Sequence, residues 1–184
     1  ELLPSLSEEG SATPMPILAY GEFTDEEALT AARQHLVEHI QVHTGFERVL
    51  YYEFHDDETG EVAAEAVSTD AKGSYFGLRF PASDIPQVAR NLYMKASWRT
   101  IPDSAAAPVN ILGQGGTPPD LSLVDLRSVS PVHLSYMQNM GVAGAVSVPV
   151  KTASRLQALI SCHSPEPKTL SLQALQALAD QVAT

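Results

Sequence analysis

The chain has 184 residues, of which 44% are hydrophobic and 18% charged, a balance typical of a folded globular protein. This length predicts a single domain with enough buried surface to fold without disulfide or metal staples. The formal net charge of −11 disfavours nucleic acids and anionic membranes as partners. The single cysteine, Cys162, excludes an internal disulfide framework and fits a cytoplasmic protein. No apolar run approaches the length that spans a bilayer.

Proline, serine and threonine dominate residues 1–22, which predicts an extended lead-in before a domain at 23–184. Because the sequence begins without methionine, we expect it to be part of a longer protein. A first amphipathic helix is predicted over 24–44, with Thr24 and a glutamate three residues later as its capping box. A second amphipathic helix is predicted over 169–184, at the end of the chain.

Two hairpins are predicted between these helices. Residues 47–54 and 61–67 are rich in β-branched and aromatic side chains or alternate in polarity, and a polar turn separates them. Residues 142–150 and 156–162 form the second hairpin, with Val146, Val148 and Val150 on one face of the strand.

Two short helices and a long loop occupy the middle of the chain. The first helix follows Pro86, and the second follows a Ser130 cap with proline at its first position. The loop at 102–120 is rich in proline and glycine, and loops of this length are often functional. The apolar residues expected to point inward from the first helix are Val88, Ala89, Leu92 and Tyr93. The order of elements predicts an α+β fold with a central antiparallel sheet flanked by helices.

Three groups of residues carry possible chemistry. His35, His39 and His43 recur every four residues on the first helix and could chelate a metal, but a polar stripe is the favoured interpretation. Cys162 and His163 are adjacent in a predicted strand, so their side chains point to opposite faces, and a buried structural cysteine is favoured over a nucleophile. The third group is dispersed along the chain and could form a site for a carboxylate or phosphate ligand, or consist of ordinary surface groups. Its members are Asp84, Arg99, Arg127, His133 and His163.

Three ordered motifs stand out in the chain: RFPASDIP at 79–86, SVSPVHLSY at 128–136 and LISCH at 159–163. Together they resemble the phytochrome GAF domain, and the similarity extends over about 44–164. The resemblance implies a GAF-like fold and a pocket for a linear tetrapyrrole such as biliverdin. Isomerisation of the outer pyrrole ring, the D ring, would then switch a two-state element under red or far-red light.

The resemblance also implies residue roles. It assigns the backbone carbonyl of Asp84 to the pyrrole N–H groups, and His163 to the D-ring carbonyl. The residues that match the propionate contacts are Arg99, Arg127, Ser130, His133 and Ser147, and those that match the walls are Tyr52, Phe80, Ile85, Pro86, Tyr93 and Tyr136. Val132 stands where plant-type members carry the attachment cysteine, so no covalent attachment residue is identified.

The favoured hypothesis is a photosensory, non-enzymatic bilin-binding domain of a bacteriophytochrome-like signalling protein, without a metal. Its expected partners are the bilin, a second copy through the two terminal helices, and an output domain outside this chain. The alternative is a phytochrome-like GAF domain that has lost bilin binding and acts in dimerisation or small-ligand sensing. A hydrolytic or metal enzyme ranks third.

Overall fold

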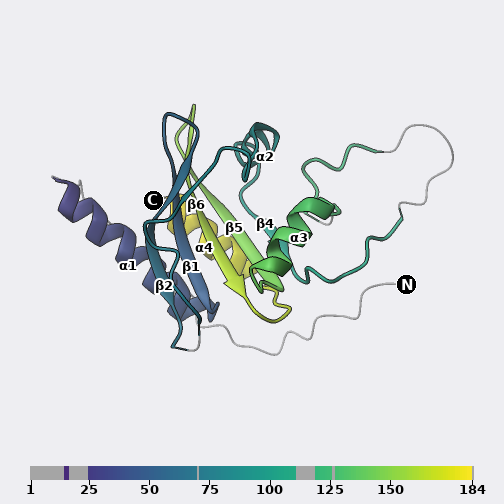
Figure 1. Cartoon of the computed structure of the whole chain (residues 1–184), viewed down its shortest axis with the longest axis horizontal. Coiled ribbons are helices and arrows are strands. Elements are labelled where there is room, and N and C mark those ends of the chain that lie inside the picture. Colours follow the sequence, from purple (N-terminus) through teal and green to yellow (C-terminus); the bar gives the residue numbers. More distant parts are fainter. Residues whose placement is uncertain (1–14, 17–24, 70, 111–118, 126, 184) are drawn as a thin grey trace.

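The structure is a computed structural model that describes residues 15–16, 25–69, 71–110, 119–125 and 127–183. The helices are α1 (Glu26–Thr44), α2 (Gln87–Tyr93), α3 (Pro131–Asn139) and α4 (Leu172–Ala183). The strands are β1 (Arg48–Phe54), β2 (Gly60–Val67), β3 (Arg79–Phe80), β4 (Arg99–Ile101), β5 (Gly144–Lys151) and β6 (Leu156–Ser164). All paired strands run antiparallel, in the order β3-β2-β1-β6-β5-β4 (Figure 1).

Side chains alternate between the two faces of this sheet, because successive residues of a strand point in opposite directions. In β1, Val49 belongs to the core cluster under the long helices, whereas Leu50 and Tyr52 belong to a second cluster on the other face. In β6, Cys162 joins the first cluster. A bulge where Tyr52 pairs with Val62 shifts the register of β2 and keeps both residues in the second cluster.

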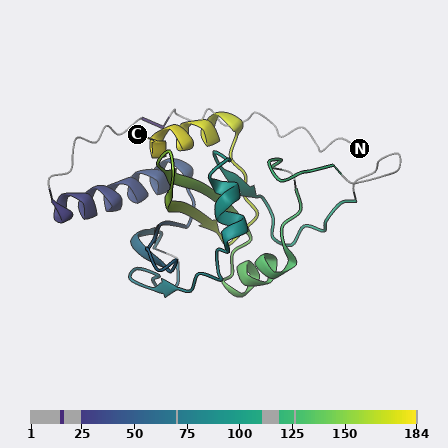
Figure 2. The same ribbon diagram turned by 90° about the horizontal axis from the view of Figure 1, so that it is seen from above.

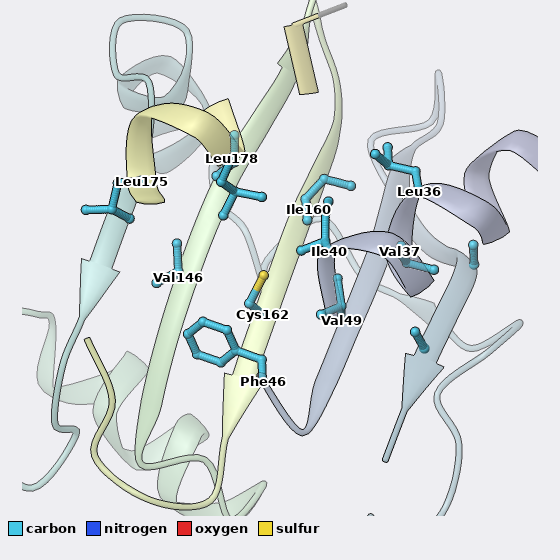
Figure 3. Close-up of a cluster of buried hydrophobic side chains, with 13 residues drawn as sticks. Leu36, Val37, Ile40, Phe46, Val49, Val146, Ile160, Cys162, Leu175 and Leu178 are labelled. Atoms are coloured by element: carbon cyan, nitrogen blue, oxygen red, sulfur yellow. The ribbon is translucent and has the colours of Figure 1, made fainter. Parts of the chain in front are cut away.

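The long helices cover one face of the sheet. Figure 3 shows Val37 and Ile40 of α1 and Leu175 and Leu178 of α4 packing over the central strands, with the sulfur of Cys162 between them. Burial of this apolar cluster is the main source of stability that the structure shows. Glycine is required at Gly144, at the start of β5, since a Cβ there would lie 2.8 Å from the main-chain nitrogen of Lys168.

The shorter helices α2 and α3 lie on the opposite face (Figure 2). They bury little: α2 has no buried residue, and α3 buries Met137 alone. Two small clusters support this face. One surrounds Leu50 and Phe54, and the other joins Met137 to Ile101 of β4. This face is therefore more open than the face beneath α1 and α4.

The predicted α+β fold, a central antiparallel sheet flanked by helices, is confirmed. Val146, Val148 and Val150 share the face of β5 that packs against the first cluster, as the alternation predicted. Strands β3 and β4 were not predicted, because they are only two and three residues long and are defined by their partners. Most of the predicted lead-in, and the glycine-rich centre of the long loop at 111–118, lie outside the described residues.

Three local predictions were wrong. Helix α1 is capped by Asp25, which has extended backbone and accepts a hydrogen bond from the Ala28 N–H at 2.8 Å, so the helix begins after the predicted Thr24. Val88 is 73% exposed, because α2 is too short to bury both sides of its apolar stripe. Ser130 occupies the N-cap position of α3, but its side chain makes no capping bond; Pro131 still opens the helix as predicted.

Two of the three histidines of α1, His39 and His43, bond to main-chain carbonyls. His39 Nε2 donates to the Pro16 carbonyl at 2.9 Å, and His43 Nδ1 donates to the His39 carbonyl at 2.8 Å. Within the described residues, no group of three or more His, Cys, Asp or Glu side chains is placed to hold a metal ion. Nor does any helix in those residues have the length and apolarity to cross a bilayer.

Candidate functional site

The segment that leads from β3 into α2 forms one edge of the candidate site. The Asp84 N–H donates to the Pro81 carbonyl, and Pro86 with extended backbone precedes the helix, as the restricted φ of proline favours. Arg90 of α2 holds this segment in place. Its Nε donates to the Ile85 carbonyl at 2.7 Å, and its guanidinium lies 4.6 Å from the centroid of the Phe54 ring.

An aromatic cluster lines the sheet beside this segment. The rings of Tyr52 and Phe80 are 5.8 Å apart, and Ile85 and Tyr93 pack against the same cluster. Tyr52 lies directly over Gly60, where a Cβ would meet the phenol ring at 2.1 Å, so this glycine makes room for the ring. Burial, helped by the nearby negative charge of Asp84, raises the pKa of Tyr52 to about 12.

The two arginines lie beside β4 and the end of the long loop. Arg99 is mostly buried, its Nη1 donates to the Asp125 carbonyl, and its Nη2 donates to the Arg127 carbonyl at 2.7 Å. Arg127 Nη1 donates to the Ser122 carbonyl at 2.8 Å. Burial lowers the pKa of Arg99, and the charge of Arg127 lowers it further, so the two cations lie close enough to repel.

Helix α3 contributes a stacked pair of rings. His133 and Tyr136 are one helical turn apart, with centroids separated by 6.4 Å and planes at 15°. Both side chains are exposed. Partial loss of hydration lowers the pKa of His133, and the nearby charge of Arg99 lowers it further.

His163 lies at the sheet surface beneath these groups. Its Nε2 is 2.9 Å from the Ser161 hydroxyl, whereas its Nδ1 is buried without a hydrogen-bond partner in the described structure. Burial, with smaller contributions from the nearby Arg48 and His133, lowers the pKa of His163 to about 4. The imidazole is therefore neutral at physiological pH. An unpartnered buried nitrogen is costly, and such groups commonly serve a ligand.

The structure brings the predicted residues to one face of the molecule. The negative charge of Asp84 raises the pKa of both Tyr52 and Tyr136, and the Tyr136 ring stacks with that of His133 in α3. Arg99 connects to His133 and to the pair formed by Tyr93 and Ser147, whose side chains also interact. Phe80 and Ile85 join the site through packing in the aromatic cluster, whereas Pro86 and Ser130 lie exposed at the starts of α2 and α3.

Sequence reasoning missed four residues that hold this arrangement. They are Tyr75, Arg90, Asp125 and Ser161. Arg90 follows the first motif by four residues and was given no role, although an arginine one turn after the start of a short helix is well placed to reach back to the preceding loop. The others act through contacts between distant segments, for which the sequence carried no local signal.

The fold and this site define a GAF domain. The family model described as "GAF domain" matches residues 28–184, and the chain belongs to this family.

The relatives found by sequence comparison are phytochromes. Cyanobacterial phytochrome B of Nostoc sp. is 44% identical over 143 residues, which are 76% of this chain and 19% of that protein. The bacteriophytochrome of Pseudomonas aeruginosa is 42% identical over 131 residues, which are 69% of this chain and 18% of that protein. The chain is thus a GAF domain of the phytochrome type, and it spans about one fifth of the length of these relatives.

Solved structures agree with this assignment. The chromophore-binding domain of a bacteriophytochrome from R. palustris superimposes with a TM-score of 0.76 at 37% identity, over 84% of this chain and 54% of that one. The chromophore-binding domain of Stigmatella aurantiaca phytochrome P1 gives a TM-score of 0.78 at 36% identity, over 88% of this chain and 53% of that one.

Proposed function

We propose that this GAF domain binds a linear tetrapyrrole of the biliverdin type and acts as the light-sensing part of a larger cytoplasmic signalling protein. The observation that carries the proposal is the gathering of the motif residues on the open face of the sheet. Aromatic walls, a pair of arginines and a neutral histidine with an unpartnered nitrogen lie together there. This combination suits a ligand with a long apolar body, polar N–H and carbonyl groups, and carboxylates.

The residues present fit such a group by their chemistry. Arg99 and Arg127 would hold propionate carboxylates, and Ser130, His133 and Ser147 would add hydrogen bonds. The Asp84 carbonyl would accept from pyrrole N–H groups. The exposed Asp84, His133 and Tyr136 side chains show that this face is accessible to a ligand.

The aromatic walls would exclude water and leave a ring space lined by Tyr52, Phe80 and Tyr93. A bound bilin would supply the photochemistry, which is isomerisation about the bond that connects its D ring. The part of this chain is to hold one D-ring orientation by a hydrogen bond from His163. When that bond is lost, the neutral imidazole would re-pair with another partner, and the rearrangement would pass to an output domain.

The binding proposed here is non-covalent within this chain. Cys162 is fully buried in the cluster beneath α1 and α4, on the face opposite the candidate site, and burial raises its pKa to about 12. A thiol in this place is neither accessible nor ionised at neutral pH.

The test is titration of the purified chain with biliverdin, followed by its absorbance. Binding predicts a strong red band that saturates at one equivalent and changes under red light. Arg127→Ala should weaken binding, while Asp180→Asn, which removes a single charge of opposite sign at an exposed position of α4, should leave it unchanged. Absence of a red band at saturating biliverdin would refute the proposal. A zinc-fluorescence gel is expected to show no covalent adduct.

A GAF domain that has lost its pigment is the second candidate. The observation that favours it is the state of Arg99, whose two terminal nitrogens already donate to main-chain carbonyls. Under this alternative the protein stays colourless, and Arg127→Ala changes neither its thermal stability nor its signalling. The same titration separates the two candidates.

We also infer that two copies pair through α1 and α4. These helices lie on the face opposite the candidate site, so pairing would leave that site accessible (Figure 2). Light scattering tests the pairing, since a mass of one chain at micromolar concentration would contradict it.

A further inference from the structure

Asp125 stands beside the arginine pair, in the segment that leads from the long loop to α3, and the proposed function gives it no role. Its carboxylate Oδ1 lies 3.5 Å from Arg99 Nη1 and accepts a hydrogen bond from the Thr100 N–H at 3.0 Å. Its Oδ2 accepts from the Thr100 hydroxyl at 2.5 Å. The carboxylate is thus fastened to β4 at the residue next to Arg99.

This placement changes the charge that a ligand would meet. Arg99 and Arg127 together carry two positive charges, and Asp125 offsets one of them within hydrogen-bonding range of Arg99. The Arg99 side chain is 11% exposed and that of Asp125 is 36% exposed, so solvent screens the pair only in part. A ligand carboxylate arriving at Arg99 would lie close to a fixed carboxylate of the same sign.

We propose that Asp125 is an internal counter-ion of Arg99 that weakens and tunes the affinity of this site for a ligand carboxylate. The inference rests on the proposed function for the identity of the ligand, but not for the electrostatic effect. Asp125 also helps to fix the position of Arg99 relative to Arg127, because the main-chain carbonyls of Asp125 and Arg127 both accept hydrogen bonds from Arg99. It is a positioning residue and need not touch the ligand.

The variant that tests this role is Asp125→Asn. It removes the charge and keeps an oxygen that can accept from the Thr100 N–H, so the loop stays attached to β4. The Thr100 hydroxyl can turn and accept from the new amide. Thr100→Val is the matched geometric variant, because it removes one hydrogen bond and keeps the carboxylate. Asp56→Asn is the charge control, since that side chain is 92% exposed in the distant β1–β2 turn.

Two probes separate the charge effect from general effects on the pocket. Biliverdin carries two carboxylates, whereas biliverdin dimethyl ester carries none. We expect Asp125→Asn to bind biliverdin about fivefold more tightly than the unmodified chain does, with the ester unchanged. Thr100→Val and Asp56→Asn should show no such gain. An equal change for acid and ester, or no change for either, would overturn the inference.

A second measurement needs no pigment. The NMR signal of the Arg99 Nε–H is followed while sodium propionate replaces sodium chloride at constant ionic strength. In Asp125→Asn the signal should respond at about fivefold lower propionate than in the unmodified chain. If biliverdin binds to no variant but this difference is present, the proposed function fails and the role of Asp125 stands. If the two propionate titrations coincide, the role of Asp125 is refuted.

Discussion

Cys162 and His163 are neighbours in β6, but their side chains lie on opposite faces of the sheet and therefore have different surroundings. Cys162 has no exposed surface and packs among aliphatic side chains. His163 faces the candidate site, with the Arg48 and His133 charges near it. Burial shifts both groups toward their neutral forms, so a thiol and an imidazole that are adjacent in sequence are separate in chemistry.

The depressed pKa of His163 predicts a pH dependence of stability. An imidazole with a pKa near 6.5 when unfolded and about 4 when folded resists protonation in the native state. The free energy of unfolding therefore falls as the pH drops from 6.5 to 4, by up to about 3 kcal/mol from this group. Urea titrations at several pH values should show a shallower loss for His163→Gln than for the unmodified chain. Parallel pH profiles for the two proteins would contradict the assignment.

The raised pKa of Cys162 predicts an inert thiol. With a pKa of about 12 and no exposed surface, it should react with a disulfide reagent at pH 8 at least about a hundredfold more slowly in the folded chain than in urea. The rate of labelling at 412 nm measures this. Prompt labelling of the folded chain would show that β6 opens readily, and it would reopen the question of covalent attachment.

At the scale of elements, the segment before the first motif depends on one buried ion pair. Glu65 of β2 pairs with Arg48 of β1, and their side chains are 4% and 7% exposed. The same carboxylate accepts from the Tyr75 N–H at 3.0 Å and from the Ser74 hydroxyl. Arg48 donates to the Lys72 carbonyl at 2.9 Å and lies over the Tyr75 ring. The loop and its tyrosine are thus held against the aromatic cluster.

Glu65→Ala should therefore destabilise the chain strongly. It leaves the Arg48 charge buried without its partner and removes the acceptor for the loop, at a cost of about 3–5 kcal/mol in the free energy of unfolding. Urea denaturation followed by circular dichroism measures the loss. The double variant Arg48→Met, Glu65→Leu serves as the comparison, because it removes both charges and should recover much of the stability. A loss below about 1 kcal/mol for Glu65→Ala would show that the pair is hydrated in solution.

Periodicity predicted the long elements of this fold, and pairing over long distances decided the rest. Strands β1, β2, β5 and β6 follow from alternation, because each is at least seven residues long. Strand β3 forms because Phe80 pairs with Gly60, and strand β4 forms because Arg99 pairs with Ser147. Neither pairing can be recognised from a local sequence pattern. The role of Asp125 could not be predicted for the same reason, because its partner Arg99 lies 26 residues away in the sequence. Five of the candidate residues were first noted as a dispersed polar group, and the family resemblance supplied the others.

At the scale of the whole molecule, the sheet divides the domain into two faces with different tasks. The face under α1 and α4 carries the largest core cluster and many side chains with no exposed surface (Figure 3). The other face carries two small clusters, short helices and the exposed side chains of the candidate site. Stability is thus concentrated on the side away from the proposed ligand. A binding surface that must adjust to its ligand benefits from this separation.

This division predicts an uneven pattern of amide hydrogen exchange. Amides of α2 and α3 should exchange through local opening, faster than those of β1 and β6, because the short helices bury one side chain between them. Biliverdin at a hundred times its Kd should slow exchange in α2 and α3 by about a hundredfold, because opening must then release the ligand. Amides in the exposed first turn of α1 fray independently of the site and serve as the internal control. Mass spectrometry of peptides with and without pigment measures all of these regions together. The proposed difference between the two faces would be contradicted if both faces were equally protected in the free chain. It would also be contradicted if bound pigment left exchange in α2 and α3 unchanged.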